Sequence, residues 1–364
     1  MALGQVEAIP AGGSRELTIP GPPEPSLGEV WRTARAVLAR DEAWAAAGHV
    51  VAHHQVQLAD VGLPGTRATG MAPEVEGAEI RLGPASFDSR SGDLTSLLGN
   101  EVSGPKLTLW RAPIENDVLD ESPAYVDVEP IASRGTGSAA PSSKEQWLAA
   151  GLDRLHRRVV DLRVEPDGLR VLHRYAPAGS QEAVIVELVW SFDGQSLYLA
   201  ADAQPTRGWG GTWPRIGLHL ELPKGIQEVR WFGTGPEENY ADSNAAAVVG
   251  RYSNDVAGMS VNYAVPQESG HRADLRELEL PDVQLRINAE PVAGELPGFS
   301  IRRHDEHQLT AASHPHQLPE PTATHLYLDA AQQGLGSRSC GPDVRPEYQL
   351  RPRAAQWAIT FAQL

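Results

Sequence analysis

Two adjacent carboxylic acids, Glu237 and Glu238, are the first residues whose types could do hydrolytic chemistry, because paired carboxyl groups can move a proton and attack a substrate. On a strand, however, neighbouring side chains point to opposite faces. We therefore expect these two carboxyl groups to diverge, and we do not assign catalysis to them.

Histidine pairs are the second candidate for chemistry. His314 and His316 flank Pro315, and on a strand this spacing would place both rings on one face, where they could hold zinc. No third ligand is evident, so exposed polar residues are the better interpretation, and no metal is assigned to the chain. His53 and His54 are interpreted as a solvated strand end.

The elements that must position these residues are mainly strands. Apolar residues alternate with polar ones, or dominate, over residues 159–164, 169–175, 184–190, 197–199, 216–222, 283–287 and 324–328. One Asp-Gly pair lies between residues 159–164 and 169–175, and another lies between residues 184–190 and 197–199. Both predict tight hairpins, because Gly tolerates the positive φ of such turns. A helix is expected over residues 143–152, whereas residues 27–39 fit either a helix or a pair of strands. The predicted fold class is all-β with antiparallel sheets, and Trp147 and Trp190 are expected in its core.

Loop-like composition divides the chain. The 364 residues are enough for two or three domains, and residues 60–70 are rich in Gly, Pro and Thr, as expected where a domain ends. Residues 133–141 are typical of a flexible loop inside the larger part. The N-terminal part has only about 60 residues, whereas an immunoglobulin-type sandwich needs roughly 100. Its remaining strands are therefore expected on another chain, or the sequence is a fragment.

The acidic composition excludes several partners. The formal net charge of −16 repels the phosphates of nucleic acids and of anionic lipids. No apolar run approaches the roughly 20 residues of a membrane span, and the N-terminus shows no secretory signal. Cys340 is the single cysteine, so no disulfide can form within the chain. We expect a cytoplasmic protein that binds neither nucleic acid nor membrane.

Five segments together resemble motifs of the long β-galactosidases of glycoside hydrolase family 2. In chain order they are residues 44–52 with Gln55, residues 109–117 (LWRAPIEND), 231–242 (WFGTGPEENYAD), 263–270 (YAVPQESG) with 276–278 (REL), and 334–342 (GLGSRSCGP). Each match alone is weak, but five matches in the family's order over nearly the whole chain are specific.

The resemblance implies an architecture. Residues 1–65 would be the end of an immunoglobulin-like β-sandwich that follows the catalytic barrel. Residues 72–364 would form the C-terminal antiparallel β super-sandwich, a type that galactose mutarotases also use. The (β/α)₈ barrel would be absent, because no run of strand–helix units fits in the remaining sequence.

The resemblance also implies the chemistry of the complete enzyme, which hydrolyses terminal β-D-galactosides such as lactose. Retaining glycosidases use two carboxyl groups about 5 Å apart, and in this family both glutamates and the Mg²⁺ ligands belong to the barrel. This chain is therefore expected to be inactive alone and to hold no cofactor, whereas the complete enzyme would use Mg²⁺ and often Na⁺. Its expected partners are the galactoside, the barrel-containing portion or large subunit, and further copies in a homo-oligomer.

Ser339 and Cys340 are the residues that the resemblance places in the sugar pocket. The family's loop offers a tryptophan to the apolar face of the sugar, because an aromatic plane suits that face. Alignment of residues 340–342 with the aromatic-x-Pro pattern places Cys340 at this position. A thiol cannot stack in this way, so either a neighbouring aromatic residue substitutes or the sugar binds less tightly. The alternative is a small buried thiol.

A second group of residues would anchor a loop beside the active site, although Leu119 stands where the family has a glycine, which would restrict the loop's mobility. The alternative is that Asn116 and Asp117 satisfy turn amides. The group consists of Arg111, Glu115, Asn116 and Asp117.

A third group belongs to the segment that contains the two glutamates. Three of its residues would shape a turn: Gly233, Gly235 and Pro236. Two others, Asn239 and Tyr240, would brace that turn.

Two other functions remain as alternatives. One is a stand-alone carbohydrate-binding module. The other is a protein like the aldose 1-epimerases, whose chemistry requires a histidine and a glutamate as acid and base over a pocket. No histidine lies in a matching motif, so the epimerase is the least favoured of the three.

Overall fold

The computed structural model describes residues 9–16, 28–61, 70–118, 141–338 and 343–364. The chain divides into two compact units, Met1–Arg67 and Ala68–Leu364, and each is described by itself. Most of the expected loops at residues 60–70 and 133–141 lies outside the described residues.

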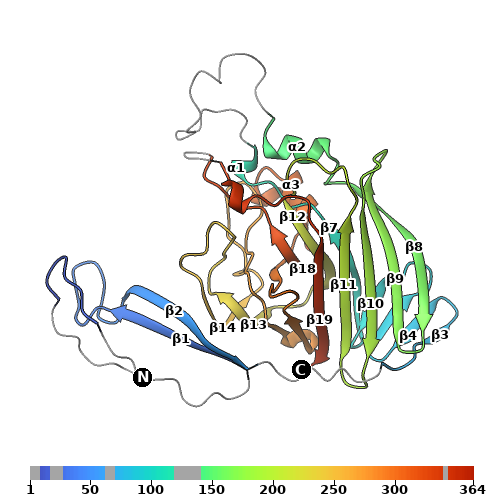
Figure 1. Cartoon of the computed structure of the whole chain (residues 1–364), viewed down its shortest axis with the longest axis horizontal. Coiled ribbons are helices and arrows are strands. Elements are labelled where there is room, and N and C mark those ends of the chain that lie inside the picture. Colours follow the sequence, from blue (N-terminus) through green and yellow to red (C-terminus); the bar gives the residue numbers. More distant parts are fainter. Residues whose placement is uncertain (1–8, 17–27, 62–69, 119–140, 339–342) are drawn as a thin grey trace. The chain divides into compact units, whose positions relative to one another are not determined.

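The smaller unit contains one antiparallel hairpin. Strand β1 (Gly28–Val37) pairs with strand β2 (Val50–Val61), so residues 28–37 form a single strand and not a helix (Figure 1). Trp44 and Val51 are more than half exposed. Because an isolated two-stranded hairpin is at best marginally stable in water, these described residues do not form a stable sandwich by themselves.

The larger unit consists of two antiparallel sheets, and Figure 1 shows the strands from β19 to β8 side by side. The nine-stranded sheet has the order β14 (Val248–Asp255), β13 (Glu228–Gly235), β15 (Glu277–Leu280), β16 (Leu285–Glu290), β19 (Ala355–Gln363), β11 (Leu197–Pro205), β10 (Val184–Phe192), β9 (Gly168–Pro177) and β8 (Leu155–Glu165). The eight-stranded sheet has the order β17 (Gly298–Arg302), β18 (Ala323–Gln332), β12 (Arg215–Pro223), β7 (Asn100–Thr108), β6 (Leu94–Leu97), β5 (Ala85–Asp88), β4 (Glu79–Leu82) and β3 (Glu74–Glu76).

Aromatic side chains join the two sheets. The ring of Trp190 on β10 lies 5.1 Å from that of Phe87 on β5 and 5.9 Å from that of Phe361 on β19, between centroids. All three side chains are buried. Alternate residues of β10 are buried, which is the period of two that the sequence showed. The predicted all-β antiparallel sandwich is thus confirmed, including the core position of Trp190.

Helices are few and short among the described residues. The predicted helix at 143–152 is α2 (Ser143–Ala149), which begins with a capping box between Ser142 and Glu145 and buries Trp147. The others are α1 (Glu115–Val118), α3 (Glu306–Ala311) and the 3₁₀ turns η2 (Pro281–Val283), η3 (Pro315–Gln317) and η4 (Pro346–Tyr348).

The strand expected over residues 283–287 starts late. Val283 ends the turn η2, and Gln284 has a left-handed backbone with φ of 53°, which no strand residue adopts. Strand β16 therefore begins at Leu285.

A Gly168→Ala substitution should lower the free energy of unfolding of the larger unit. A Cβ atom at this position would lie 2.0 Å from the carbonyl oxygen of Trp190, so β9 and β10 would have to separate. We expect a loss of about 1–3 kcal/mol, measured by urea unfolding of the purified chain. Gly225→Ala is the control, because its Cβ would meet no atom within 4 Å. Equal stability of the two variants would contradict this packing.

Candidate functional site

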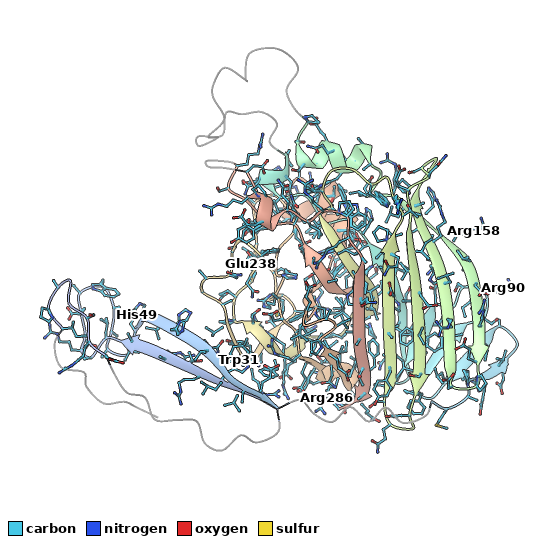
Figure 2. The ribbon with its side chains drawn as sticks, in the orientation of Figure 1. Trp31, His49, Arg90, Arg158, Glu238 and Arg286 are labelled. Carbon is cyan, nitrogen blue, oxygen red and sulfur yellow. The ribbon has the colours of Figure 1, made fainter. Side chains whose placement is uncertain are left out.

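Four segments that are distant in the sequence meet at one pocket of the larger unit. The pocket has a volume of about 210 Å³. Its walls come from the segments that follow β7, β13 and β18 and from the connection between β14 and β15. Figure 2 labels Glu238, one of its lining residues. The lining consists of Ile114, Glu115, Asn116, Glu238, Tyr240, Tyr263, Gln267, Glu268, Leu335 and Gly336.

Arg111 is fully buried and organises the wall that follows β7. Its Nη2 donates to both carboxylate oxygens of Asp117, at 2.9 and 3.0 Å, and to the carbonyl oxygen of Gly334 at 3.2 Å. Asp117 also accepts a hydrogen bond from the backbone N–H of Ile114 at 3.0 Å. Burial raises the pKa of the Asp117 carboxyl, and the Arg111 guanidinium opposes this rise. The pair thus ties the start of α1 to the segment after β18.

The segment of residues 333–336 is held from two further sides. The side-chain amide of Asn116 donates to the carbonyl oxygens of Leu335 and Gly336, at 3.0 and 2.9 Å. The carboxylate of Asp242 accepts from the backbone N–H groups of the same two residues, both at 2.8 Å. Four backbone groups without a strand partner are thereby satisfied, which fixes this segment beside the pocket.

The residues expected to anchor a loop therefore hold the segment that precedes the expected sugar-contact loop. Ser339 and Cys340, which were expected to contact the sugar, lie outside the described residues, and so does Leu119. Glu115 is exposed at the pocket, and its backbone N–H donates to the side chain of Gln267 at 3.2 Å.

Glu237 and Glu238 lie in a turn after β13 and not in a strand. Glu237 is exposed, whereas the carboxylate of Glu238 accepts from the backbone N–H of Gly270 at 2.6 Å and from the hydroxyl of Tyr263 at 3.3 Å. The two side chains have different surroundings, as expected, but the turn causes this and not strand alternation.

Gly233 and Gly235, expected to shape this turn, instead belong to strand β13. Packing explains the lack of a side chain at both. A Cβ on Gly235 would lie 2.9 Å from the ring of Tyr252, and one on Gly233 would lie 3.0 Å from the carbonyl oxygen of Asp274. The turn begins only at Pro236.

Asn239 and Tyr240 join the turn after β13 to the connection between β14 and β15. The side-chain oxygen of Asn239 accepts from the hydroxyl of Thr234 at 2.9 Å and from the N–H of Ala273 at 3.0 Å. Tyr240 is buried, which raises the pKa of its hydroxyl well above the usual value. That hydroxyl accepts from the backbone N–H of His271 at 3.5 Å.

A cluster of buried charges around Glu268 adjoins the pocket. The carboxylate of Glu268 contacts the guanidinium groups of Arg215 and Arg302, each at 2.9 Å, and all three side chains are at most 5% exposed. Burial alone would raise the pKa of Glu268, but the two guanidinium groups outweigh it and lower that pKa. Arg215 Nε is also 2.9 Å from Asp329 Oδ1, although neither atom has an aligned hydrogen bond, so this contact is an ion pair only.

Glu306 of α3 extends the cluster. It accepts from the hydroxyl of Thr108 at 3.1 Å and from that of Tyr327, whose ring stacks on His219 with 4.5 Å between centroids. Burial lowers the pKa of His219 to about 4, so this ring is neutral at neutral pH and becomes charged only in acid. Burial would raise the pKa of Glu306, but His219, protonated at such low pH, and Arg215 lower it to about 2.

The pocket is lined by groups that can form hydrogen bonds with hydroxyls, and Glu268 among them is not suited to donate a proton. A general acid for glycoside cleavage must carry a proton near neutral pH. Because the pKa of Glu268 is lowered, its carboxyl group carries no proton there. The amides, hydroxyls and carboxylates of the lining can each donate to or accept from a polyhydroxylated ligand.

The chain also matches known families over almost its whole length. The family model described as β-galactosidase small chain matches residues 83–362, and that described as β-galactosidase, domain 4 matches residues 2–59. The chain belongs to the β-galactosidase small-chain family. The family predicted from the five sequence segments is thus confirmed.

Individual relatives of this small chain are much longer proteins. A β-galactosidase of Arthrobacter sp. (strain B7) is 45% identical over 95% of this chain and 34% of the relative. A β-galactosidase of Aeromonas hydrophila subsp. hydrophila is 31% identical over 86% of this chain and 30% of the relative. The chain therefore spans about a third of the length of these relatives.

Solved structures add little. A galactose mutarotase related enzyme from Lactobacillus acidophilus overlaps 80% of this chain and 96% of its own chain, at 6% identity and a TM-score of 0.33. A likeness at this level carries no argument about function.

Within the described residues of this small chain, no group of three or more His, Cys, Asp or Glu side chains is arranged to hold a metal ion. The Mg²⁺ that the family resemblance implies for a complete enzyme therefore finds no fitting ligand set there. His314 and His316 stack on each other, 5.5 Å apart, and are exposed. They belong to the 3₁₀ turn η3 and its N-cap and not to a strand. Their rings still lie side by side, but no third ligand joins them among the described residues. No described helix is long and apolar enough to cross a membrane.

Sequence reasoning missed Asp242 and Glu268 as site residues, although both lie in quoted segments. It also missed the buried partners Arg215, Arg302 and Asp329. The sequence did contain one indication of these partners. A charged residue at a strand position where the pattern predicts a core residue needs a buried partner of opposite charge. The order of the strands in the sheets determines which charged side chains contact each other, and a local sequence pattern does not predict that order.

Asp242→Asn should loosen the segment after β18 without unfolding the small chain. An asparagine offers one acceptor oxygen in place of two, so one of the two N–H groups at Leu335 and Gly336 loses its partner. We expect these two amides to open more easily, by about 1–3 kcal/mol, in native-state hydrogen exchange. Asp282→Asn, which removes a similar carboxylate from the N–H groups of Gln227 and Glu228, is the control and should leave residues 335–336 unchanged.

Glu306→Gln should destabilise the small chain most at neutral pH. The pKa of Glu306 is lowered in the folded chain, from 4.5 to about 2, so its carboxylate adds stability that is present above pH 4.5 and lost as the pH falls toward 2. We expect a loss of about 3–5 kcal/mol at pH 7 that shrinks by pH 3, measured by urea unfolding. Glu79→Gln, at an exposed carboxylate, should change stability little at either pH. A loss of the same size at both pH values would contradict the assignment.

Proposed function

We propose that this chain is the C-terminal part, or small subunit, of a retaining β-galactosidase that hydrolyses terminal β-D-galactosides such as lactose. In this proposal the chain lines one side of the sugar pocket and helps to scaffold a homo-oligomer. The catalytic glutamates, Mg²⁺ and any Na⁺ belong to the part of the enzyme outside this chain. The observation that carries the proposal is the convergence of four of the five motif segments at one pocket.

Exposed apolar side chains on the segments that line the pocket support a docking role. Val118 of α1 is 46% exposed, and Tyr263 and Val265 of the connection between β14 and β15 are 39% and 42% exposed. Apolar side chains that remain exposed beside a pocket are found on surfaces that a partner covers. A barrel-bearing portion resting there would close the pocket and bring its carboxyl groups to the sugar.

The hairpin of the smaller unit supports the same proposal independently. Strand β2 exposes Val50, Val51 and Val56, and the two strands cannot enclose a core. The match of residues 2–59 to β-galactosidase domain 4 agrees with a sandwich whose other strands come from elsewhere.

The alternatives are less favoured. An epimerase requires a histidine over an accessible pocket, and no histidine lines the pocket of about 210 Å³. The chain alone should therefore leave the mutarotation rate of α-galactose unchanged. A stand-alone binding module does not explain the exposed apolar side chains beside the pocket.

Complementation tests the proposal. The purified chain should not hydrolyse nitrophenyl β-galactoside, whereas co-expression with the N-terminal two thirds of the Arthrobacter sp. (strain B7) relative should produce activity. Asn116→Ala should lower kcat/KM of that assembly by about tenfold, because it frees the segment beside the pocket.

Asn244→Ala removes a comparable but exposed hydrogen bond and is the matched control, with no expected effect. The N-terminal portion alone is the second control. Activity of the purified chain by itself would contradict the proposal that the catalytic glutamates lie outside this chain. Activity of the N-terminal portion that the chain does not increase would contradict the pocket role.

A further inference from the structure

One face of the eight-stranded sheet carries a layer of polar side chains. Strand alternation points them away from the core of the sandwich, because their neighbours Leu218 and Leu328 belong to that core. Glu268 and Glu306 cover the layer, from the connection between β14 and β15 and from α3. The layer consists of Lys106 and Thr108 of β7, Arg215, His219 and Glu221 of β12, Arg302 of β17, and His325, Tyr327 and Asp329 of β18.

Two histidines lie side by side in this layer. Nε2 of His219 is 3.0 Å from Nδ1 of His325, so a single proton between them forms a hydrogen bond, and the rings stack with 5.2 Å between centroids. Nε2 of His325 is buried and has no hydrogen-bond partner among the described residues. His219 is only partly buried, so protons can reach the pair. If both rings were protonated, both facing nitrogens would carry hydrogens and this hydrogen bond would be lost.

Charged groups surround the pair. Lys106 on β7 stands opposite His219, and Arg302 on β17 stands opposite His325. The other titratable groups near the pair are Glu221 of β12, Tyr327 of β18, and Asp305 and Glu306 of α3. Burial outweighs the attraction of the carboxylates and lowers the pKa of both histidines, that of His219 to about 4. The folded layer therefore favours two neutral rings.

Hydrogen bonds connect the pair to the pocket wall that follows β7. Tyr327, whose ring stacks on His219, donates its hydroxyl to Glu306 of α3. Glu306 also accepts from the hydroxyl of Thr108 at 3.1 Å, and that hydroxyl accepts from the backbone N–H of Trp110 at 3.2 Å. Trp110 in turn donates its indole N–H to Thr310 of α3 at 3.4 Å. Helix α3 therefore holds the chain where it leaves β7 and enters the pocket wall.

The wall formed by the connection between β14 and β15 is connected through Arg302. This arginine stands opposite His325 and forms an ion pair of 2.9 Å with Glu268. The backbone N–H of Glu268 donates to the carbonyl oxygen of Ala112 at 3.1 Å, so the two walls also contact each other. A change in the polar layer can therefore reach both walls.

We infer that the His219–His325 pair is an acid-sensitive element that releases α3 and these two walls of the pocket when it takes up protons. Two charged rings would repel each other and the cations beside them, whereas two neutral rings share a hydrogen bond. The opposite face of the same strands is apolar core, so the sandwich itself should stay closed. One consequence, a loss of activity in acid, rests on the proposed function, whereas the opening itself does not.

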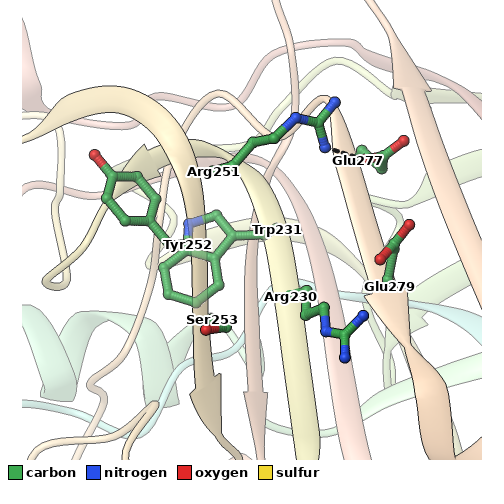
Figure 3. A pocket seen from close by; sticks show the side chains of 7 residues that line it. All are labelled: Arg230, Trp231, Arg251, Tyr252, Ser253, Glu277 and Glu279. Carbon is green, nitrogen blue, oxygen red and sulfur yellow. Dashed lines mark hydrogen bonds and ion pairs between the residues drawn. The ribbon is translucent and has the colours of Figure 1, made fainter.

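A second hollow, on the nine-stranded sheet, offers a comparison within the same chain. Its volume is about 330 Å³, and Figure 3 shows the arginines and glutamates that line it, of which Arg251 and Glu277 form an ion pair. No histidine is among the described residues of its lining. Arginine and glutamate ordinarily keep their charges between pH 7.5 and pH 5.5, so the strands beneath this hollow should not respond to acid in that range.

Hydrogen exchange of the purified full chain at pH 7.5 and pH 5.5, measured by mass spectrometry and corrected for the intrinsic rate, tests this inference. A released imidazole regains the ordinary pKa of 6.5, so stability of the closed state is present above pH 6.5 and is lost as the pH falls toward 4. His219 alone should then increase the exchange of residues 108–117 and 306–311 by about tenfold at pH 5.5. Peptides from β10 and from β13 should not change.

Two variants separate titration of His219 from its structural role. His219→Phe keeps a ring against Tyr327 that cannot be protonated, and His219→Gln keeps a donor to His325 if the phenylalanine does not fit. Each should remove most of the tenfold increase. His307→Gln, at an exposed position on α3, is the matched control and should keep it.

Three outcomes would overturn the inference: no increase in the wild-type chain, an increase that persists in both His219 variants, or an equal increase in the peptides from β10 and β13. None of them involves hydrolysis. Failure of the complementation experiment would therefore remove the proposed function and leave this result standing.

Discussion

Glu268 is held between two buried arginines, and the shape of the first pocket depends on this contact. Arg215 comes from β12 and Arg302 from β17, whereas Glu268 belongs to the irregular connection between β14 and β15. Removing one partner of a buried pair leaves an uncompensated charge, at a cost of about 3–5 kcal/mol. The connection is therefore fixed against the eight-stranded sheet by charge, in addition to the isolated backbone bridge between Arg272 and Phe299. Because the same connection supplies Tyr263 and Gln267 to the pocket, the ion pairs position a wall of the site.

Polar side chains also fix the segment of residues 333–336 beside the pocket, through hydrogen bonds to its backbone. Arg111, Asn116 and Asp242 bind backbone groups of residues 333–336 from different elements. Each uses a charged or amide side chain to satisfy backbone that a sheet does not pair. A site built in this way is rigid at its base, while the apolar residues beside it, such as Val265, remain uncovered. The larger unit thus exposes apolar side chains beside the pocket, and the hairpin of the smaller unit exposes others.

Local sequence pattern was enough for the strands and the family, but not for the site. The Asp-Gly turns and the alternation in β9 and β10 identified hairpins, because these depend on neighbours in sequence. Gly233 and Gly235 were misread as turn residues, since the ring of Tyr252 that requires Gly235 lies on another strand. Glu268 was quoted within a motif, yet its partners stand more than thirty residues away along the chain. Motif resemblance identified segments that meet in the fold, and only strand order showed which of their residues touch.

The position of β19 has a consequence for how the molecule is made. It is the last described strand along the chain, yet it lies inside the nine-stranded sheet, between β16 and β11. Before residues 355–363 are synthesised, the other eight strands of this sheet can form only two separate groups, each with an unpaired edge where β19 will lie. The core around Phe361 is completed only when β19 pairs with β16 and β11, and until then the two unpaired edges favour aggregation.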